Sequence, residues 1–120
     1  MDAHMEARRR ALWWDRAKNR IPLRKLIEKY NVSTSTVTKD IQSWTPIIAA
    51  RCVERGLPYI REGRDWKGRD RNWMYYIWEG HPDSGGKQLS RHGYYRLPDA
   101  LDALLVILKE RGIDLDSYPF

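Results

Sequence analysis

The chain has 120 residues, of which 42% are hydrophobic and 32% charged, enough apolar side chains for one small core. It contains no apolar run of about 18 residues and does not start like a signal peptide, so we expect no membrane span, no secretion and a cytoplasmic location. The single cysteine, Cys52, cannot form an internal disulfide. No second cysteine or tight histidine cluster gives zinc-ligand spacing, and we expect no metal and no cofactor.

The charge of the chain is unevenly distributed. Residues 1–30 contain nine Lys and Arg against four Asp and Glu, whereas residues 97–120 contain two against five. With a net charge of +6, this pattern favours a polyanionic partner that touches one end of the molecule. The run Arg8-Arg9-Arg10 either reaches phosphate groups or forms a solvated helix face.

The first half of the chain has helical periodicity and clear helix boundaries. We predict helices over residues 3–20, from Pro22 to about residue 30, and over residues 34–43. Asn31 suits the sharp turn between the second and third helices because it tolerates left-handed backbone angles, and Ser33 suits the N-cap of the third. The third helix is expected to bury Val37, Ile41 and Trp44, which follow the i, i+4, i+7 spacing of one face.

The second half predicts a small sheet and a last helix. Pro46 is expected to start a fourth helix over residues 47–55, closed by Gly56. Short aromatic runs at residues 57–61, 73–78 and 94–97 predict strands, and a final helix is expected over residues 99–111. The fold class is therefore α+β and mainly helical, in one domain. Its expected parts are a helical unit (1–56), an antiparallel sheet with an enlarged wing (57–97), and a C-terminal helix and tail (98–120).

Residues 32–41, Val-Ser-Thr-Ser-Thr-Val-Thr-Lys-Asp-Ile, carry the most specific pattern. They resemble the helix-turn-helix of DeoR-type regulators, which runs roughly V-S-x-x-T-[IV]-x-x-D-[LI]. The usual turn glycine is Asn31 here, one of the family's two basic residues is Lys39, and the other is Thr38. The resemblance covers about 25 residues and implies a recognition helix that enters the major groove of DNA. A helical hairpin used for protein contacts is the other interpretation of this pattern.

The exposed face of that helix supplies the candidate DNA-binding residues. We expect contacts with base edges from Thr34, Ser35, Thr38, Lys39 and Gln42, because amide, ammonium and methyl groups match adenine, guanine and thymine. Thr36 and Ser43 are expected to contact phosphates. The alternative is that this face is simply polar, as exposed helix faces are.

A second resemblance begins at residues 55–59, Arg-Gly-Leu-Pro-Tyr. This segment is similar to the strand entry of MerR-like, excisionase and small-terminase DNA-binding domains, and residues 93–101 are similar to the segment that follows their wing. Here more residues separate the two parts, and the insertion at 63–73 interleaves four cations with two tryptophans. The expected phosphate-binding residues of this wing are Arg64, Lys67, Arg69 and Arg71. Alternatively, Trp66 and Trp73 cover the core while neighbouring Arg and Asp neutralise each other.

These features predict a winged helix-turn-helix protein that binds double-stranded DNA sequence-specifically and regulates transcription, with no enzymatic activity. A phage-type excisionase or DNA-packaging factor is the alternative within DNA binding. A protein–protein adaptor with an acidic partner is the alternative of another class. We also predict a homodimer through the C-terminal helix, because its apolar stripe is wider than a helix buried on one side needs; the stripe contains Leu101, Leu104, Leu105 and Leu108.

Overall fold

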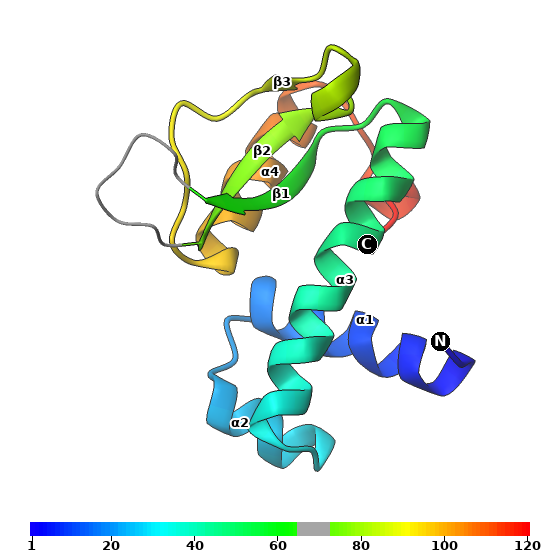
Figure 1. The fold of residues 1–120 in the computed structure, drawn as a ribbon, viewed down its shortest axis with the longest axis vertical. Helices are drawn as coiled ribbons and strands as arrows, with labels where there is room; N and C mark the ends of the chain where they lie inside the picture. Colours follow the sequence, from blue (N-terminus) through cyan, green and yellow to red (C-terminus); the bar gives the residue numbers. More distant parts are fainter. Residues whose placement is uncertain (65–72) are drawn as a thin grey trace.

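The computed structural model describes residues 1–64 and 73–120. Its helices are α1 (Ala3–Ala17), α2 (Leu23–Tyr30), α3 (Thr34–Arg55) and α4 (Leu97–Glu110), and its strands are β1 (Tyr59–Arg64), β2 (Trp73–Glu79) and β3 (Lys87–Gln88). Two short 3-10 turns, η1 (Pro82–Ser84) and η2 (Leu115–Ser117), complete the order. The helix α3 spans the molecule, from the α1–α2 region at one end to the sheet and α4 at the other (Figure 1). The α+β, mainly helical prediction is thereby confirmed.

The boundaries of the first three helices follow from local chemistry. The Asp2 carboxylate accepts a hydrogen bond from the backbone N–H of Met5 at 2.7 Å and caps α1. Asn31 ends α2 in the left-handed region, with φ 51°, and Ser33 caps α3 by accepting from the N–H of Thr36 at 3.2 Å. The Asp2 and Ser33 side chains bind backbone N–H groups that a helix start otherwise leaves without a partner, and Asn31 adopts the left-handed angles that the turn requires. The predicted positions of the turn and of the start of α3 are confirmed.

The predicted break at Pro46 is wrong, because α3 is one helix of 22 residues with Pro46 inside it. Proline lacks the N–H that would bond to the carbonyl of Gln42. Both Pro46 and Gln42 are exposed, so this carbonyl lies on a side of the helix that water reaches. On the opposite side, Trp44, Ile48 and Cys52 are buried at successive spacings of four. The packing of that continuous row outweighs the roughly 3 kcal/mol that proline costs inside a helix.

The sheet is antiparallel, in the order β1-β2-β3. The first two predicted strands are confirmed with shifted ends, but the third, over 94–97, is wrong. Tyr94 makes only a single bridge to Tyr75, and Leu97 is already the first residue of α4, with Pro98 in its first turn. The third strand is instead Lys87–Gln88, an exposed polar pair that lacks the alternation by which strands are recognised in a sequence.

The larger hydrophobic core lies between α3, α4, α1 and the sheet. Leu101, Leu104 and Leu108 of α4 are buried within this core, Leu105 is half-buried, and Val106 is 56% exposed. One chain therefore already covers most of the apolar stripe from which the homodimer was inferred. The homodimer stays a prediction without that support.

A second, smaller core joins the first three helices. Its fully buried members are Leu12 of α1, Leu26 of α2 and Val37 of α3, and half-buried residues such as Ile27 and Val32 surround them. The half-buried Ile41 packs against both cores.

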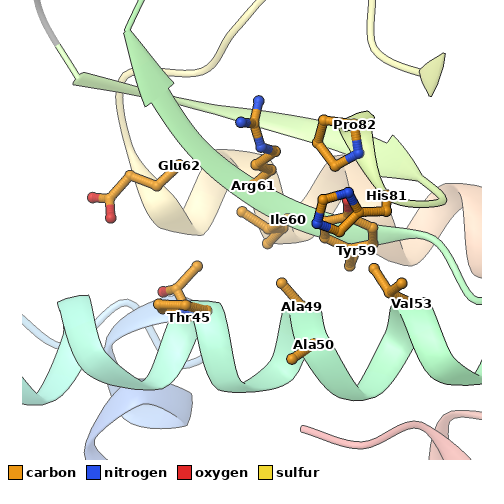
Figure 2. Close-up of a pocket in the computed structure, with 11 residues that line it drawn as sticks. Thr45, Ala49, Ala50, Val53, Tyr59, Ile60, Arg61, Glu62, His81 and Pro82 are labelled. Carbon is orange, nitrogen blue, oxygen red and sulfur yellow. The ribbon is translucent and has the colours of Figure 1, made fainter. Parts of the chain in front are cut away.

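A pocket of about 460 Å³ lies between the C-terminal half of α3 and β1 (Figure 2). None of the helices in the described part of the chain is both long and apolar enough to cross a bilayer.

Candidate nucleic-acid interface

The turn between α2 and α3 sets the direction of α3. Val32 is half-buried in the turn, and Leu26 and Val37 are fully buried on either side of it. The side of α3 that holds Val37 therefore faces α1 and α2, and the opposite side faces solvent. The predicted burial of Val37 and Trp44 is confirmed, whereas Ile41, predicted with them, is half-buried.

The predicted base-contacting residues share this outer side. Thr34, Ser35, Thr38, Lys39 and Gln42 are all exposed, whereas Thr36 and Ser43 are half-buried. The hydroxyl of Thr38 donates to the carbonyl of Thr34 at 3.1 Å. The hydroxyl of Thr36 lies 3.0 Å from that of Ser33, at the capped end of the helix. Thus the structure brings the α3 candidates together on one polar surface within two to three turns of helix.

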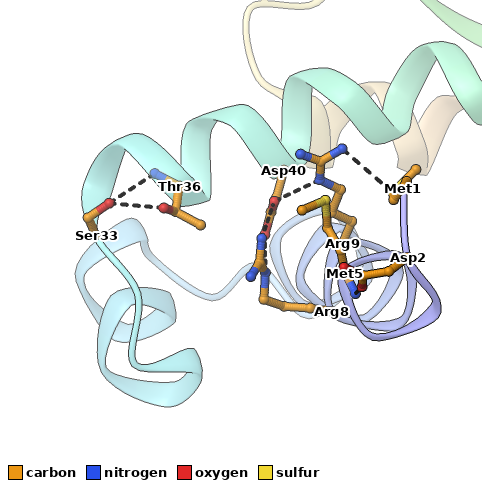
Figure 3. A network of polar contacts seen from close by, with 8 residues as sticks. All are labelled: Met1, Asp2, Met5, Arg8, Arg9, Ser33, Thr36 and Asp40. Carbon is orange, nitrogen blue, oxygen red and sulfur yellow. Dashed lines mark hydrogen bonds and ion pairs between the residues drawn. The ribbon is translucent and has the colours of Figure 1, made fainter.

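The only acidic residue of this half-helix, Asp40, points away from that surface and is fully buried. Arg8 binds it with two hydrogen bonds, from Nε at 2.8 Å and from Nη2 at 3.0 Å, and Arg9 adds a third from Nε at 2.9 Å (Figure 3). The hydrogen bond to Asp40 raises the pKa of Arg8, against the opposing effect of burial. The run Arg8-Arg9-Arg10 was expected either to reach phosphate groups or to form a solvated helix face. Neither interpretation describes Arg8 and Arg9, because they neutralise a buried carboxylate and connect α3 to α1.

The third arginine of the run has a different position. Arg10 is half exposed, lies 3.7 Å from Glu6 and places its guanidinium 5.4 Å from the centre of the Trp44 ring. Arg51 lies at 5.3 Å from the same ring. Arg10 of α1 and Arg51 of α3, which also pairs with Glu6, therefore lie where these two helices meet and are not part of the α3 surface defined above.

A second buried carboxylate ties α2 to α1. Asp15 accepts hydrogen bonds from Asn19 at 2.9 Å, from the Lys29 ammonium at 2.7 Å and from the Tyr30 hydroxyl at 2.5 Å. Burial alone would raise the pKa of Asp15, but these hydrogen bonds together outweigh it and lower the pKa. Burial and the Asp15 carboxylate raise the pKa of Tyr30.

This geometry predicts an acid dependence of stability. The pKa of Asp15 is lower in the folded state than its ordinary value of 3.8, so the unfolded state binds more protons in that range. The free energy of unfolding should therefore fall as the pH drops through and below 3.8, and Asp15→Asn should remove part of that fall. Urea unfolding at a series of acidic pH values measures it, with the exposed Asp83→Asn as the matched control. An identical pH dependence in Asp15→Asn and wild type would refute this role.

Three further cations flank the connection between α1 and α2 and were not among the predicted site residues. Lys18, Arg24 and Lys25 are exposed, and their side chains make no hydrogen bond or ion pair with the described residues. Arg24 and Lys25 belong to the first turn of α2. Their charge is visible in the sequence, but their exposure required the fold.

The predicted wing is described only in part. Arg64 is the last residue of β1, and Lys67, Arg69 and Arg71 lie outside the described residues. Trp73, the first residue of β2, is 57% exposed, so it does not cover the core in the way the alternative interpretation required.

In the described part of the chain, no three His, Cys, Asp or Glu side chains are placed to hold a metal ion. Comparison with protein-family models, curated proteins and solved structures finds no match for this chain.

Proposed function

We propose that this protein binds double-stranded DNA sequence-specifically through the N-terminal half of α3. One observation carries the proposal: five polar or basic side chains share the exposed face of residues 34–43, and the single acid of that segment is turned inward and neutralised. A merely solvated helix face has no need to exclude negative charge. A face that approaches a polyanion does, because an exposed carboxylate would be repelled by phosphates.

The proposed contacts divide into readout and positioning. Lys39 and Gln42 read base edges, since ammonium groups pair with guanine acceptors and amides pair with adenine. Thr38 uses its hydroxyl within the helix, which leaves its methyl group for a thymine methyl. Arg24 and Lys25, at the start of α2, contact phosphates and set the register of the complex.

The hairpin of β1 and β2 is the proposed wing. From the C-terminal end of α3, β1 returns along that helix toward its N-terminal half (Figure 1). The cationic segment that includes Arg64, Lys67, Arg69 and Arg71 connects β1 to β2. Regulation of transcription and assembly as a homodimer complete the proposal. A dimer would present two copies of α3 to a palindromic site.

The reading surface predicts a specific loss of affinity. Replacing Lys39 and Gln42 together by alanine should weaken binding to a selected duplex by about 1–3 kcal/mol for each base that the variant no longer reads. Both side chains are exposed, so the thermal unfolding midpoint should stay close to that of the wild type. The site is first obtained by selection from random duplexes, and affinities are then measured by fluorescence anisotropy at several salt concentrations.

Lys109→Ala is the matched control, because it removes an exposed positive charge from the acidic C-terminal segment. It should leave affinity for the selected duplex unchanged. Full-strength binding by the Lys39 and Gln42 double variant would exclude α3 as the reader. If no duplex binds at low salt, the proposal fails and the adaptor alternative is favoured, since phosphate contacts give all DNA-binding proteins a generic, salt-dependent affinity.

A further inference from the structure

The pocket between α3 and β1 lies apart from the reading surface of residues 34–43, beside the first strand of the hairpin proposed as the wing. One wall is the C-terminal half of α3 and the other is β1, with the start of η1 at one end (Figure 2). Four consecutive residues of β1, from Tyr59 to Glu62, line it. A wall made of consecutive strand residues presents backbone groups as well as side chains.

Within the part of the chain that the structure describes, the backbone of β1 has no partner on the side away from β2. β1 is an edge strand, and its partners in β2 include Tyr75, opposite Glu62, and Ile77, opposite Ile60. Tyr75 and Ile77 direct their backbone groups away from β1, because Tyr75 exchanges bonds of 2.8 and 2.7 Å with Tyr94 and the Ile77 carbonyl accepts from Leu89. In an antiparallel pair, opposite residues either exchange hydrogen bonds or both face outward.

It follows that Ile60 and Glu62 direct their N–H and C=O groups outward. No hydrogen bond within the described residues uses these four groups. Both residues line the pocket. The open edge therefore offers two donor–acceptor pairs, separated by one strand repeat of about 6.6 Å.

The wall formed by α3 is apolar where it meets this edge. Pro46 and Ala50 are exposed, and Ala49 and Val53 are half-buried beside them. Exposed helix positions usually carry charged or polar side chains that keep the surface solvated. Here four small or apolar residues occupy the flank that lies along an unpaired strand edge. Such a flank can receive the side chain of a residue that pairs with β1.

The charged side chains of the pocket lie at different places along it. Arg61 is exposed, with its guanidinium 5.2 Å from the Trp78 ring centre, and His81 lies at the end of the pocket where η1 begins. Glu62, the one acidic side chain of the lining, places its carboxylate at the opposite end (Figure 2). Because Ile60 is buried and Arg61 exposed, a strand added here would alternate between a residue over α3 and a residue beside Arg61.

We propose that the β1 edge and the apolar flank of α3 bind an extended segment of a partner protein, added as a strand beside β1. The segment places an apolar side chain over Ala49 and Val53 and an acidic one beside Arg61. A peptide backbone is the occupant because it supplies alternating donors and acceptors at the strand repeat, whereas the apolar flank sets the side-chain preference. Opposite charges on neighbouring strands add to the preference for an acid next to arginine.

The test uses the whole protein labelled with ¹⁵N and an acetylated, amidated heptapeptide, Ser-Val-Asp-Val-Asp-Val-Ser. At saturating peptide, the amides of Ile60 and Glu62 should shift and exchange with solvent on the order of tenfold more slowly, because they gain hydrogen bonds. Ala50→Arg should weaken binding at least several-fold by filling the flank with a bulky cation. Ala11→Arg, the same change at an exposed position of α1, should bind as the wild type does.

A second peptide tests the strand geometry, because it is methylated at the alternate backbone nitrogens that would face β1 and keeps every side chain. The methyl groups remove these donors and clash with the β1 edge, so this peptide should neither bind nor protect the two amides. Equal binding of the methylated peptide, shifts confined to another surface, or no shift at millimolar peptide would overturn the proposal. Protection of the same amides by self-association in the absence of peptide would also overturn it, in favour of a second copy of this chain.

Discussion

Replacing Arg8 and Arg9 together by alanine is expected to lower the free energy of unfolding by about 3–5 kcal/mol. Asp40 is fully buried, and within the described parts of the chain its carboxylate accepts three hydrogen bonds, all from these two arginines. Without them, a carboxylate is left in the interior with no partner, which costs far more than the pair itself contributes. Urea unfolding, followed by circular dichroism, measures the loss.

Two further variants separate the effect of leaving the Asp40 carboxylate without a partner from the effect of losing other contacts of the arginines. Arg10→Ala, in the same run but half exposed, should cost less than about 1 kcal/mol. Adding Asp40→Leu to the double variant should recover most of the lost stability, because it removes the charge that lacks a partner. Failure to recover would assign the loss to packing of the arginine stems against α3 instead.

The sequence predicted this region well where the signal is local. Asn31 and Ser33 identify a turn and a cap by their own backbone and hydrogen-bonding chemistry, and both act at those positions. Gly56 likewise ends α3 in the left-handed region, with φ 67°. The exposure of Lys39 and Gln42 followed from helical periodicity once the start of α3 was known.

The contacts that fix the site could not be predicted in the same way. Asp40 is bound by residues more than thirty positions earlier, and nothing in the sequence pairs it with Arg8 and Arg9 rather than with Arg10. The cluster around Asp15 likewise depends on how α2 folds back on α1. Three of the cations assigned to the wing lie outside the described residues, so this part of the predicted site stays a prediction.

The errors in the fold have one physical origin, which is that tertiary packing outweighs local preference. Pro46 favours a helix start, yet the buried row from Trp44 to Cys52 keeps α3 continuous through it. Residues 94–97 favour a strand, yet Leu97 is buried as the start of α4. In both places the deciding partner lies far away in the sequence.

The second large effect is expected from Leu26→Ala, with a loss of about 2–5 kcal/mol. Leu26 is the only fully buried residue of α2, and with Leu12 and Val37 it forms the smaller core beneath the proposed reading surface. So few side chains hold α2 in place that a cavity there cannot be filled by neighbours. Affinity for DNA should fall as well, because the orientation of α3 depends on this core. Urea unfolding and duplex binding measure the two losses.

The two cores also predict where the Leu26→Ala variant loosens. Among the described residues, the half-buried Ile41 is the one hydrophobic side chain that packs against both cores, so amide exchange should accelerate in α2 and at the start of α3 more than in β2. Leu23→Ala is the matched control, since it makes the same change in the same helix at an exposed position and should cost less than about 0.5 kcal/mol. Leu104→Ala, in the larger core, should instead accelerate exchange in the sheet. Uniform acceleration across α2 and β2 in Leu26→Ala would show that the two cores unfold as one unit.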